Sequence, residues 1–587
     1  KLCSKKAGGR VPEYPRQELP DATKWDHTKW SPNYRNDNRI ETHESGTAPC
    51  KTACPAHVAV QGYLKLAAQG RYDEALALIK RENPLPAICG RVCNRRCEDA
   101  CTRGRVDAAV AIDEVKKFIA QRDLDAATRY VPPVVTPTRA GGFDQKIAII
   151  GAGPAGLSCA FYLAEKGYKP VVFEKNERPG GMLTYGIPSF KLQKDVIEAE
   201  VEVIRLMGAE FRYGVEVGRD VTLDELRAQG FKAFYVAIGC QGGRPAGIPG
   251  EDAEDVTVAV DFLREVNSGK IDALPGRTIV VGGGNVAIDV ARNACRLGSE
   301  HVEMFCLESE AQMPASEEER REAIEDGAHI SCGWGPKEVH LDEAGHVCGI
   351  TFKRCTRVYD DEGRFAPEYD ESDLRRVDAD RVVMSIGQSI VWGDLLAGSK
   401  VELGRGQGAL ADPQTYQTAE PDIFVGGDVY TGPSFAIDAI AAGHEAAVSI
   451  HRFVQPGSTL TIGRNQRRYT ALDRDDVVIE SYDNASREVA HVDREREKAA
   501  PFSEYVETFT EEQVRAETAR CLGCGASIVD PNKCIGCGLC TTKCAFDAIH
   551  LDRDRPECST MVKYEQKLPS LGKYALKRAI KIKFGKK

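Results

Sequence analysis

Two stretches of the chain show the same succession of apolar, glycine-rich and mixed positions. Residues 147–150 (I-A-I-I) and 278–281 (T-I-V-V) are short runs rich in apolar residues, and glycines follow each run directly. A run of this kind is typical of a buried parallel strand. The positions after the glycines favour a helix, and another apolar run at 170–173 follows the first of these helices. The pattern therefore predicts two strand-helix-strand units in an α/β protein.

The first unit carries the spacing G-x-G-x-x-G between its strand and its helix. Gly151 permits a tight turn, Gly153 lets the backbone approach a pyrophosphate, and Gly156 lets the helix pack on the strand. Glu174 ends the next strand, where a carboxylate accepts hydrogen bonds from ribose hydroxyls. These features predict a dinucleotide site with the pyrophosphate at the helix N-terminus. The same site would include Pro154, Ala155 and Lys175.

The second unit carries the related spacing G-x-G-x-x-A, filled by Gly282, Gly284 and Ala287. Hydride transfer between two nucleotide cofactors requires two such sites, because each cofactor needs its own. The sequence therefore predicts an oxidoreductase. The other residues expected at the second nucleotide are Asn285 and Val286.

Length and charge limit the class of protein. A chain of 587 residues is too long for one core, and 42% apolar with 28% charged residues is typical of a soluble globular protein. No apolar run is long enough to span a membrane, and a net charge of −10 argues against a general nucleic-acid binder. We therefore expect several domains, no membrane span and no nucleic-acid partner.

The 21 cysteines are grouped, six of them between positions 50 and 101 and six between 521 and 544. Clustered cysteines without secretory features indicate metal binding in a reducing compartment, which predicts a cytoplasmic protein. In the first group the thiolates recur at intervals of four, so they can converge on a soft metal centre. The paired C-x-x-C of structural zinc, the alternative, is missing there. This group comprises Cys50, Cys54, Cys89, Cys93, Cys97 and Cys101.

The second group contains the spacing C-x-x-C-x-x-C-x-x-x-C of bacterial ferredoxins. In two-cluster ferredoxins the fourth cysteine of this run binds the other cluster, so Cys544 would join Cys521 and Cys524. Ser527 stands at the third position of that half-motif, which leaves a ligand for Cys558 or Cys3 to supply. A zinc ribbon is the alternative, but it leaves the last two cysteines of the run unexplained. The run itself is Cys534, Cys537, Cys540 and Cys544.

Residues 46–456 resemble the small subunit of glutamate synthase and are similar to the N-terminal part of dihydropyrimidine dehydrogenase. The resemblance rests on A-C-P, N-P-L-P-A-I-C-G-R-V-C, C-E-D-A-C and V-A-I-D-E-V-K-K-F in the first cysteine group, and on the two glycine motifs. It implies a helical iron–sulfur domain followed by a flavoprotein that binds FAD and either NAD(H) or NADP(H).

The resemblance also implies how the first cysteine group is shared between clusters. Cys54, Cys93 and Cys97 would bind one [4Fe-4S] cluster, and Cys50 and Cys101 the other. Such relatives carry an extra C-x-x-C just ahead of the first of these cysteines, where this chain reads H-E-S-G-T-A-P. The second cluster therefore lacks ligands, and we expect only one cluster in this domain.

The fourth ligand of the first cluster also differs. The matching position is Lys116, which cannot bind iron while it is protonated. Asp113, Glu114 or Cys89 would have to replace it.

The resemblance extends over the rest of the flavin site. Asp428 would hydrogen-bond the ribityl chain, and the helix that opens after Pro433 would point its N-terminus at the flavin. Cys240 is alone near the flavin, so we do not expect a disulfide reductase. The other residues assigned to FAD are Gly181, Met182, Gly427, Ser434 and Ala436, and Gly387 is assigned to the nicotinamide nucleotide.

The choice of nucleotide is predicted from the segment that begins at Val302. NADP-using relatives place paired arginines there to hold the 2′-phosphate, whereas this chain has Leu307 and Glu308. A carboxylate binds a 2′-hydroxyl and repels a 2′-phosphate. We therefore expect NADH, with Arg292 and Arg296 as the cations that would still reach a phosphate.

The expected fold is an α/β flavoprotein with two dinucleotide-binding domains, an N-terminal all-α iron–sulfur domain and a C-terminal α+β ferredoxin-like domain. The expected order is an arm (1–45), the helical domain (46–128), the FAD domain (141–250 and 386–456), the NAD(P)H domain (251–385), a connector (457–510), the ferredoxin-like domain (511–558) and a basic tail (559–587).

We therefore predict an NADH-linked subunit that moves electrons between NAD(H), FAD and two to four [4Fe-4S] clusters. Its partners would be other redox subunits or ferredoxin in a hetero-oligomeric complex, and flavin-based electron bifurcation is conceivable. One alternative is an NADPH-dependent glutamate synthase small subunit. The other is a wiring subunit that keeps the clusters without turning over a nucleotide.

Overall fold

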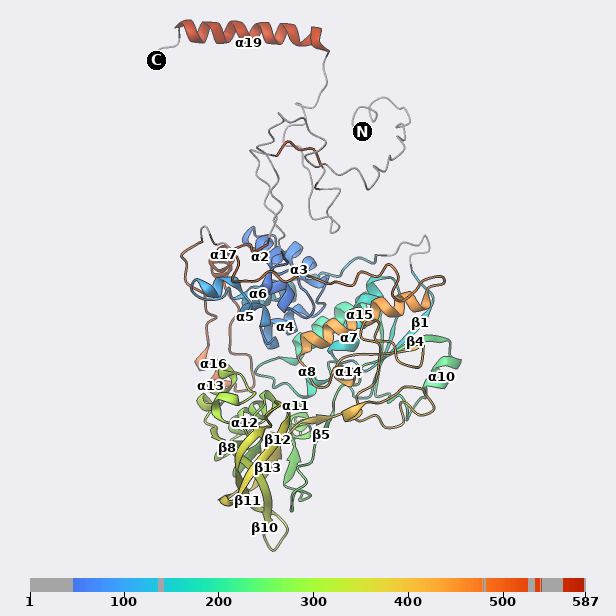
Figure 1. Ribbon diagram of the computed structural model, residues 1–587, viewed down its shortest axis with the longest axis vertical. Coiled ribbons are helices and arrows are strands. Elements are labelled where there is room, and N and C mark those ends of the chain that lie inside the picture. The colour runs from blue at the N-terminus through green and yellow to red at the C-terminus, as the bar shows by residue number, and fades with distance from the viewer. Residues whose placement is uncertain are drawn as a thin grey trace. The chain divides into compact units, whose positions relative to one another are not determined.

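The computed structural model describes residues 46–135, 142–477, 479, 482–525, 534–538, 540 and 563–584. The chain divides into two compact units. One is Ser45–Ala526, and the other combines the terminal segments Lys1–Glu44 and Ser527–Lys587. The larger unit holds a helical domain and two sheet domains (Figure 1).

The N-terminal domain is all α-helical and is drawn in blue in Figure 1. Its helices form because apolar residues recur at helical spacing, as in α2, where Val60, Tyr63, Leu64 and Ala67 are buried. The elements are α1 (Pro49–Ala53), α2 (Val60–Ala68), α3 (Tyr72–Lys80), α4 (Pro86–Val92), α5 (Arg96–Asp99), the short 3₁₀-helix η2 (Thr102–Arg105) and α6 (Ile112–Leu124).

The first sheet domain is built on five parallel strands in the order β15-β4-β1-β2-β3. The central strands are buried, as their apolar runs predict. The strands are β1 (Lys146–Ile150), β2 (Val171–Glu174), β3 (Glu210–Tyr213), β4 (Phe231–Val236) and β15 (Ile423–Val425). The helices are α7 (Pro154–Glu165), α8 (Met182–Tyr185), α9 (Lys194–Leu206), α10 (Leu223–Ala228), α14 (Asp428–Thr431) and α15 (Ala436–Val454).

Helices α7 and α15 pack closely because Gly443 has no side chain. A Cβ on Gly443 would stand 2.3 Å from the carbonyl oxygen of Ala155. The two helices belong to a hydrophobic core that also contains the helical domain. The first sheet domain and the helical domain therefore share one hydrophobic core.

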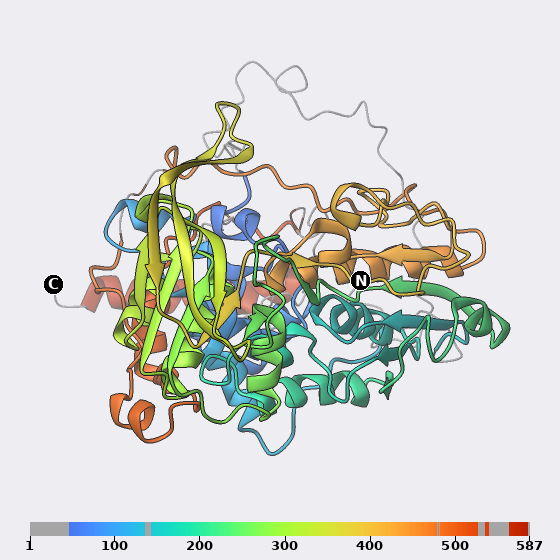
Figure 2. The ribbon, with the colours of Figure 1, turned by 90° about the horizontal axis from the view of Figure 1, so that it is seen from below.

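The second sheet domain also has five strands, in the order β6-β13-β7-β8-β9, and all its strand pairs are parallel. A three-stranded antiparallel sheet extends from it and is yellow in Figure 2. The parallel strands are β6 (Val256–Val258), β7 (Arg277–Val281), β8 (His301–Cys306), β9 (His329–Cys332) and β13 (Arg381–Met384). The antiparallel strands are β10 (Trp334–Leu341), β11 (Val347–Tyr359) and β12 (Phe365–Val377).

Smaller elements complete this domain and its borders. The helices are α11 (Ala259–Asn267), α12 (Asn285–Arg296) and α13 (Glu317–Glu325), with the short 3₁₀-helices η3 (Glu310–Gln312) and η4 (Arg405–Gln407). Strands β5 (Gly242–Gly243) and β14 (Gln388–Ser389) pair where the chain crosses between the two sheet domains.

The segment after α15, expected to be a polar connector, contacts both the helical domain and the second sheet domain. Glu504 accepts from Arg91 (3.0 Å) and pairs with Lys117 (2.8 Å) of the helical domain. The next residue, Tyr505, accepts from Arg292 of the second sheet domain, 2.7 Å away. The helices of this segment are α16 (Arg494–Ala499) and α17 (Glu511–Ala519).

The expected start of the ferredoxin-like domain at residue 511 differs from the structure. Helix α17 packs against α2 and α6, and the division into units falls between residues 526 and 527. Residues 511–525 therefore belong with the helical domain. In the smaller unit the structure describes helix α19 (Tyr564–Phe584), whose side chains are exposed. The expected arm (1–45) and Cys3, Ser527, Cys544 and Cys558 lie outside the described residues.

Candidate functional site

The first glycine loop connects β1 to α7 and leaves its backbone open toward the helix N-terminus. Gly151 has a φ of 103°, which favours glycine, and its N–H donates to the carbonyl of Phe173 at 2.8 Å. A Cβ on Gly156 would stand 1.9 Å from the carbonyl oxygen of Gly151, whereas a Cβ on Gly153 would meet nothing within 4 Å. The open side at Gly153 is where a diphosphate would approach the unpaired N–H groups of α7.

Glu174 is held next to this loop. It is 2% exposed, and its Oε2 accepts from the backbone N–H of Ala152 at 2.8 Å. Its Oε1 accepts from the backbone N–H of Asn176 at 2.9 Å. The carboxylate is therefore fixed at the carboxyl end of β2, where a dinucleotide ribose would lie.

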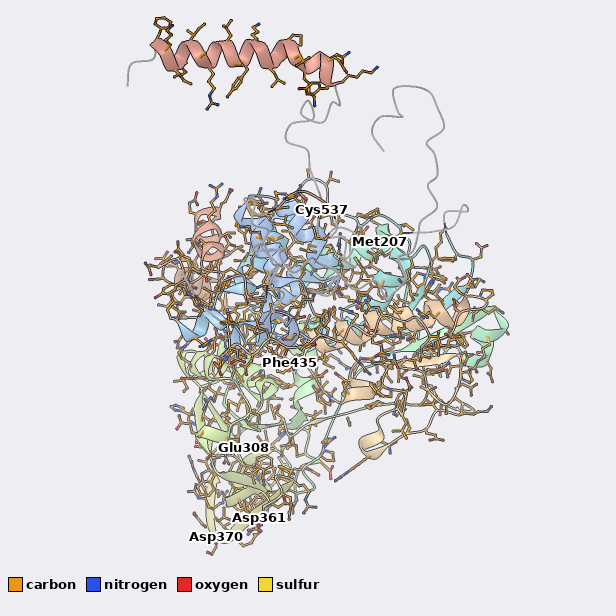
Figure 3. All side chains as sticks on the ribbon, turned by 45° about the horizontal axis from the view of Figure 1, so that its top comes forward. Met207, Glu308, Asp361, Asp370, Phe435 and Cys537 are labelled. Atoms are coloured by element: carbon orange, nitrogen blue, oxygen red, sulfur yellow. The ribbon has the colours of Figure 1, made fainter. Side chains whose placement is uncertain are left out.

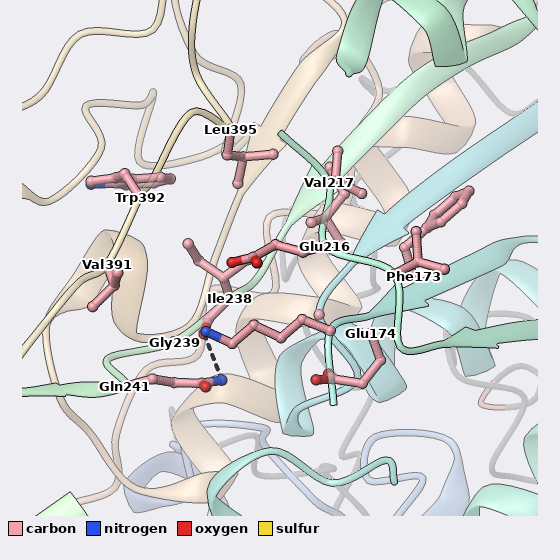
Figure 4. A pocket seen from close by; sticks show the side chains of 14 residues that line it. Phe173, Glu174, Glu216, Val217, Ile238, Gly239, Gln241, Val391, Trp392 and Leu395 are labelled. Carbon is pink, nitrogen blue, oxygen red and sulfur yellow. Dashed lines mark hydrogen bonds between the residues drawn. The ribbon is translucent and has the colours of Figure 1, made fainter. Parts of the chain in front are cut away.

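A partly open hollow adjoins this carboxylate (Figure 4). Lys175 and Gly239 line it, together with Trp392 and Leu395, which the sequence reasoning did not assign. Gln241 donates from Nε2 to the carbonyl of Ile238 at 3.2 Å. Apolar side chains opposite a carboxylate and a lysine suit an adenosine group, whose base is flat and whose ribose is polar.

Two further segments meet the first glycine loop. A Cβ on Gly181 would lie 3.1 Å from Cα of Gly153, and a Cβ on Gly427 would lie 3.1 Å from Cβ of Ala155. The structure thus brings the residues assigned to FAD from distant parts of the chain into one place.

Asp428 follows Gly427 in sequence and is the first residue of α14. Its Oδ1 accepts from the backbone N–H of Ser434 at 3.2 Å, and burial raises the pKa of its carboxyl group. Helix α15 begins at Ala436, and its first turn adjoins this region, because a Cβ on Gly427 would lie 3.8 Å from Cβ of Ala439. Cys240 is buried and free, and it donates to the carbonyl of Asp428 at 3.8 Å.

The second glycine loop repeats this geometry between β7 and α12. Gly282 has a φ of 145°, and a Cβ there would stand 2.3 Å from the carbonyl oxygen of Ser385. A Cβ on Gly284 would meet nothing within 4 Å, so its backbone is open to a diphosphate. Asn285 is the first residue of α12, and its Oδ1 accepts from the backbone N–H of Ser316 at 3.2 Å. Val286 and Ala287 follow in α12, and Gly387 has a φ of 123°.

Glu308 lies beside this second loop, in the domain where Figure 3 labels it. Its Oε2 is 3.0 Å from the place where a Cβ on Gly283 would stand. The neighbouring Arg320 donates from Nη1 to the carbonyl of Glu310 at 2.7 Å. The loop that would face the adenosine ribose therefore carries a carboxylate next to its backbone.

The two arginines considered as phosphate ligands are engaged elsewhere. Arg292 is 1% exposed and pairs with Glu322 and with Asp326, the latter at 2.7 Å. Arg296 pairs with Asp326 at 2.8 Å and with Glu497 at 2.7 Å. Both guanidinium groups thus bind carboxylates and the connector, and neither is available to a 2′-phosphate in this conformation.

The cysteines of the helical domain fall into two sets. In the first, Cys54, Cys93 and Cys97 lie close enough to Lys116 or to one another for their charges to interact. Burial alone would lower the pKa of Lys116, but the neighbouring Asp113 carboxylate and the thiols raise it well above its usual value. Lys116 therefore stays protonated and cannot bind iron.

The three candidates for the fourth ligand of the first cluster differ in their neighbours. Cys89 is 1% exposed, and it and Asp113 both face Lys116, whose Nζ is 2.5 Å from Asp113 Oδ1. The charged groups that act most strongly on Glu114 are instead Lys117, Asp113, Arg95 and Glu98. The structure thus favours Cys89 or Asp113 over Glu114.

This first set stands beside the flavin region. Arg96, next in sequence to Cys97, pairs with Asp438 in the first turn of α15, with N–O distances of 2.9 and 3.1 Å. The same guanidinium lies 5.5 Å from the ring centre of Phe435, which Figure 3 labels. An iron–sulfur centre here would adjoin the helix that closes the flavin site.

The second set joins two parts of the chain that were expected to lie in different domains. Cys50, Cys101, Cys521 and Cys524 line one small cavity. We expected the last two to serve the ferredoxin-like domain, and the structure places them at the helical domain instead. Of the ferredoxin run, Cys534, Cys537 and Cys540 are described and are exposed.

A single metal ion needs ligands that are closer together than those of an iron–sulfur cluster. Within the described residues, no three or more His, Cys, Asp or Glu side chains are grouped as they would be around one metal ion. The ligands of a [4Fe-4S] cube stand further apart, because each thiolate binds a different iron.

Comparison with known proteins identifies the parts. Residues 145–443 match the pyridine nucleotide-disulphide oxidoreductase family. Residues 41–128 match dihydropyrimidine dehydrogenase domain II with its 4Fe-4S cluster, and residues 527–550 match a 4Fe-4S binding domain. This chain belongs to the pyridine nucleotide-disulphide oxidoreductase family. The predicted fold class and the FAD, nicotinamide-nucleotide and [4Fe-4S] cofactors are thereby confirmed.

Three curated relatives cover most of the oxidoreductase. The NADP(+)-dependent formate dehydrogenase subunit beta of Moorella thermoacetica is 35% identical over 81% of this chain and 70% of its own length. The glutamate synthase [NADPH] small chain of Escherichia coli is 35% identical over 70% and 89%, respectively. The NAD-dependent dihydropyrimidine dehydrogenase subunit PreT of Escherichia coli is 33% identical over 70% and 91%. All three names describe one chain of a larger redox enzyme, and the predicted role in electron transfer is confirmed at that level.

No helix that the structure describes in this oxidoreductase has the length and apolarity needed to cross a membrane.

The two nucleotide domains of the oxidoreductase are joined by Lys191, whose Nζ lies 2.7 Å from Asp289 of α12 and also pairs with Glu319. The three side chains are largely buried. At this domain contact one lysine therefore neutralises two carboxylates.

Lys191→Met should lower the free energy of unfolding by about 2–4 kcal/mol, because it leaves two carboxylates without their cation in a partly dry contact. Thermal denaturation of the purified protein measures this. Lys337→Met is the matched control, since its pair with Glu371 (3.3 Å) is exposed and should contribute less than about 1 kcal/mol. Equal loss in both variants would contradict the role of Lys191.

Proposed function

We propose that this oxidoreductase is the NADH-linked subunit of a multi-subunit electron-transfer enzyme. FAD, when bound, exchanges a hydride with the nicotinamide nucleotide and single electrons with iron–sulfur clusters. The chain's own residues bind and align these groups. The open backbone at Gly153 and Gly284 would receive the two diphosphates, and Arg96 with Asp438 joins the helical domain to the flavin helix. The clustered free thiols suit a cytoplasmic location.

The observation that carries the choice of NADH is the position of Glu308. Its carboxylate adjoins Gly283, while Arg292 and Arg296 are turned to other partners. A carboxylate beside the ribose accepts hydrogen bonds from two hydroxyls and repels a phosphate dianion. Some relatives are named for NADPH and others for NAD, so membership of the family does not select the nucleotide. The support for NADH comes from the residues at the site of this chain.

Anaerobic titration with NADH and, separately, with NADPH tests the proposal. We expect NADH to bleach the bound flavin at much lower concentration and to reduce the iron–sulfur centres, seen by EPR. A preference for NADPH would contradict the proposal and favour the alternative of an NADPH-dependent glutamate synthase small subunit. Absence of bleaching by either nucleotide would favour a wiring subunit.

The partners would be other redox subunits or a ferredoxin. The C-terminal 4Fe-4S region and the helical domain provide two iron–sulfur regions that could accept electrons from one flavin. This arrangement suits a chain that transfers electrons to another protein. The terminal substrate would then belong to the partner.

A further inference from the structure

Four thiols from two distant parts of the chain line a single cavity beneath α2. Cys50 is in α1 and is 9% exposed, and Cys101 precedes η2. Cys521 and Cys524 come from the loop after α17, more than 400 positions later. The remaining walls are mostly apolar and include Val60, Leu64, Val110 and Ile112. A group of cysteines in an apolar wall is a ligand set rather than a solvated surface.

The loop that brings the two late cysteines is fixed to the helical domain. Glu517 of α17 and Arg520 are both fully buried, pair at 2.6 Å and bind residues of the helical domain. Glu517 accepts from the backbone N–H of Ala111 at 2.7 Å, and Arg520 donates to the carbonyl of Ala108 at 2.6 Å. A fully buried ion pair is costly unless every partner is in place, so this docking is specific.

The loop itself is also anchored at its second cysteine and at the residue that follows it. Gln61 donates from Nε2 to the carbonyl of Cys524 at 2.7 Å. Gly525 has a φ of 65°, and a Cβ there would stand 2.6 Å from the carbonyl oxygen of Gly46. The C-L-G-C segment is therefore pressed against the chain just ahead of Cys50.

Burial sets the charge requirement of this cavity. Cys50, Cys101, Cys521 and Cys524 line the same cavity, and most of the other residues that line it are apolar. One buried and three half-buried thiols in an apolar cavity can become thiolates together only if a bound cation supplies positive charge. Iron in a cube with four cysteine ligands does so.

We propose that Cys50, Cys101, Cys521 and Cys524 bind one [4Fe-4S] cluster that is shared between the helical domain and the segment after α17. The expectation of a single cluster in the helical domain is then replaced by two. This inference goes beyond the proposed function, because it holds whichever nucleotide reduces the flavin.

The shared cluster would continue the route from the flavin. Cys54 is the C-cap of α1, one turn beyond Cys50, or about 6 Å along the helix axis. The set of Cys54, Cys93 and Cys97 therefore neighbours the shared cavity on one side and the flavin helix on the other. The next cysteine of the chain after Cys524 is Cys534, the first of the ferredoxin run. The shared site thus adjoins the first cysteine set in space and precedes the ferredoxin run in sequence.

The test counts iron and acid-labile sulfide per chain in the full-length protein, purified anaerobically. We expect Cys521→Ser/Cys524→Ser and Cys50→Ser/Cys101→Ser each to lose four iron and four sulfide. The quadruple variant should lose the same four, because all four residues serve one cube. A loss of eight would assign the two pairs to separate clusters, and full iron in the Cys521/Cys524 variant, or zinc in place of iron, would also overturn the proposal.

Cys348→Ser is the matched control, because Cys348 lies in β11 of the second sheet domain and should leave the iron content unchanged. Flavin content monitors folding in every variant. If the double variants lose flavin, the single variants Cys101→Ser and Cys524→Ser replace them, since a serine oxygen can keep the cube in place. Both should alter the same component of the reduced EPR spectrum. Changes in two different components would contradict a shared cluster.

Discussion

Gly156→Ala is expected to leave the protein with little bound FAD. The new Cβ would stand 1.9 Å from the backbone carbonyl of Gly151 and 3.3 Å from Ile149 Cγ2. A backbone oxygen cannot rotate away as a flexible side chain can, so the start of α7 must shift. Overpacking of this kind costs about 3 kcal/mol, which corresponds to roughly a 100-fold weaker site if the shift falls on the bound state. The ratio of flavin to protein absorbance after gel filtration measures the effect.

Gly153→Ala separates the packing of the loop from its contact with the cofactor. A Cβ at Gly153 meets nothing within 4 Å, and its φ of −76° suits alanine. The methyl group would nevertheless project where the diphosphate approaches. We expect this variant to lose FAD affinity while its cofactor-free form keeps the wild-type melting temperature, whereas Gly156→Ala lowers both. The same melting temperature in both cofactor-free variants would show that the close contact at Gly156 is relieved without cost.

The double substitution Leu307→Arg/Glu308→Arg is expected to change the preferred nucleotide from NADH to NADPH. Removal of the Glu308 carboxylate removes a repulsion, and two guanidinium groups add charge-assisted hydrogen bonds to a 2′-phosphate. Each such bond contributes about 1.5–3 kcal/mol, so the preference should move by about 100-fold or more. Stopped-flow measurement gives the rate constant of flavin reduction and the Kd for each nucleotide. The ratio of rate constant to Kd, compared between NADH and NADPH, measures the change.

A change of net charge alone must be excluded as the cause. Glu343→Arg/Ala344→Arg adds the same positive charge at an exposed turn between β10 and β11 of the same domain. It should leave the ratio of NADH to NADPH rates as in the wild type. An unchanged ratio in the Leu307/Glu308 variant would show that another group, with Arg320 the first candidate, selects the nucleotide.

The amino-acid sequence by itself determined the two glycine loops and the fold class. These features are local: a buried strand, a glycine that needs a positive φ and a helix N-terminus follow one another within a few residues. Gly151 and Gly282 have the expected conformations. Glu174 stands at the end of its strand for the same reason. The spacing of Cys534 to Cys544 is equally local, and the match to a 4Fe-4S binding domain agrees with it.

Tertiary structure decided what depends on partners far away in sequence. Spacing cannot show that Arg292 and Arg296 point to Asp326 and the connector, because their helix would be the same if they faced a phosphate. Nor can it show that Cys521 and Cys524 join the helical domain. Arg520 and Ala108, 412 positions apart, meet only because α17 docks there. A buried ion pair and a shared apolar core fix that contact, and neither leaves a periodic signal in the sequence.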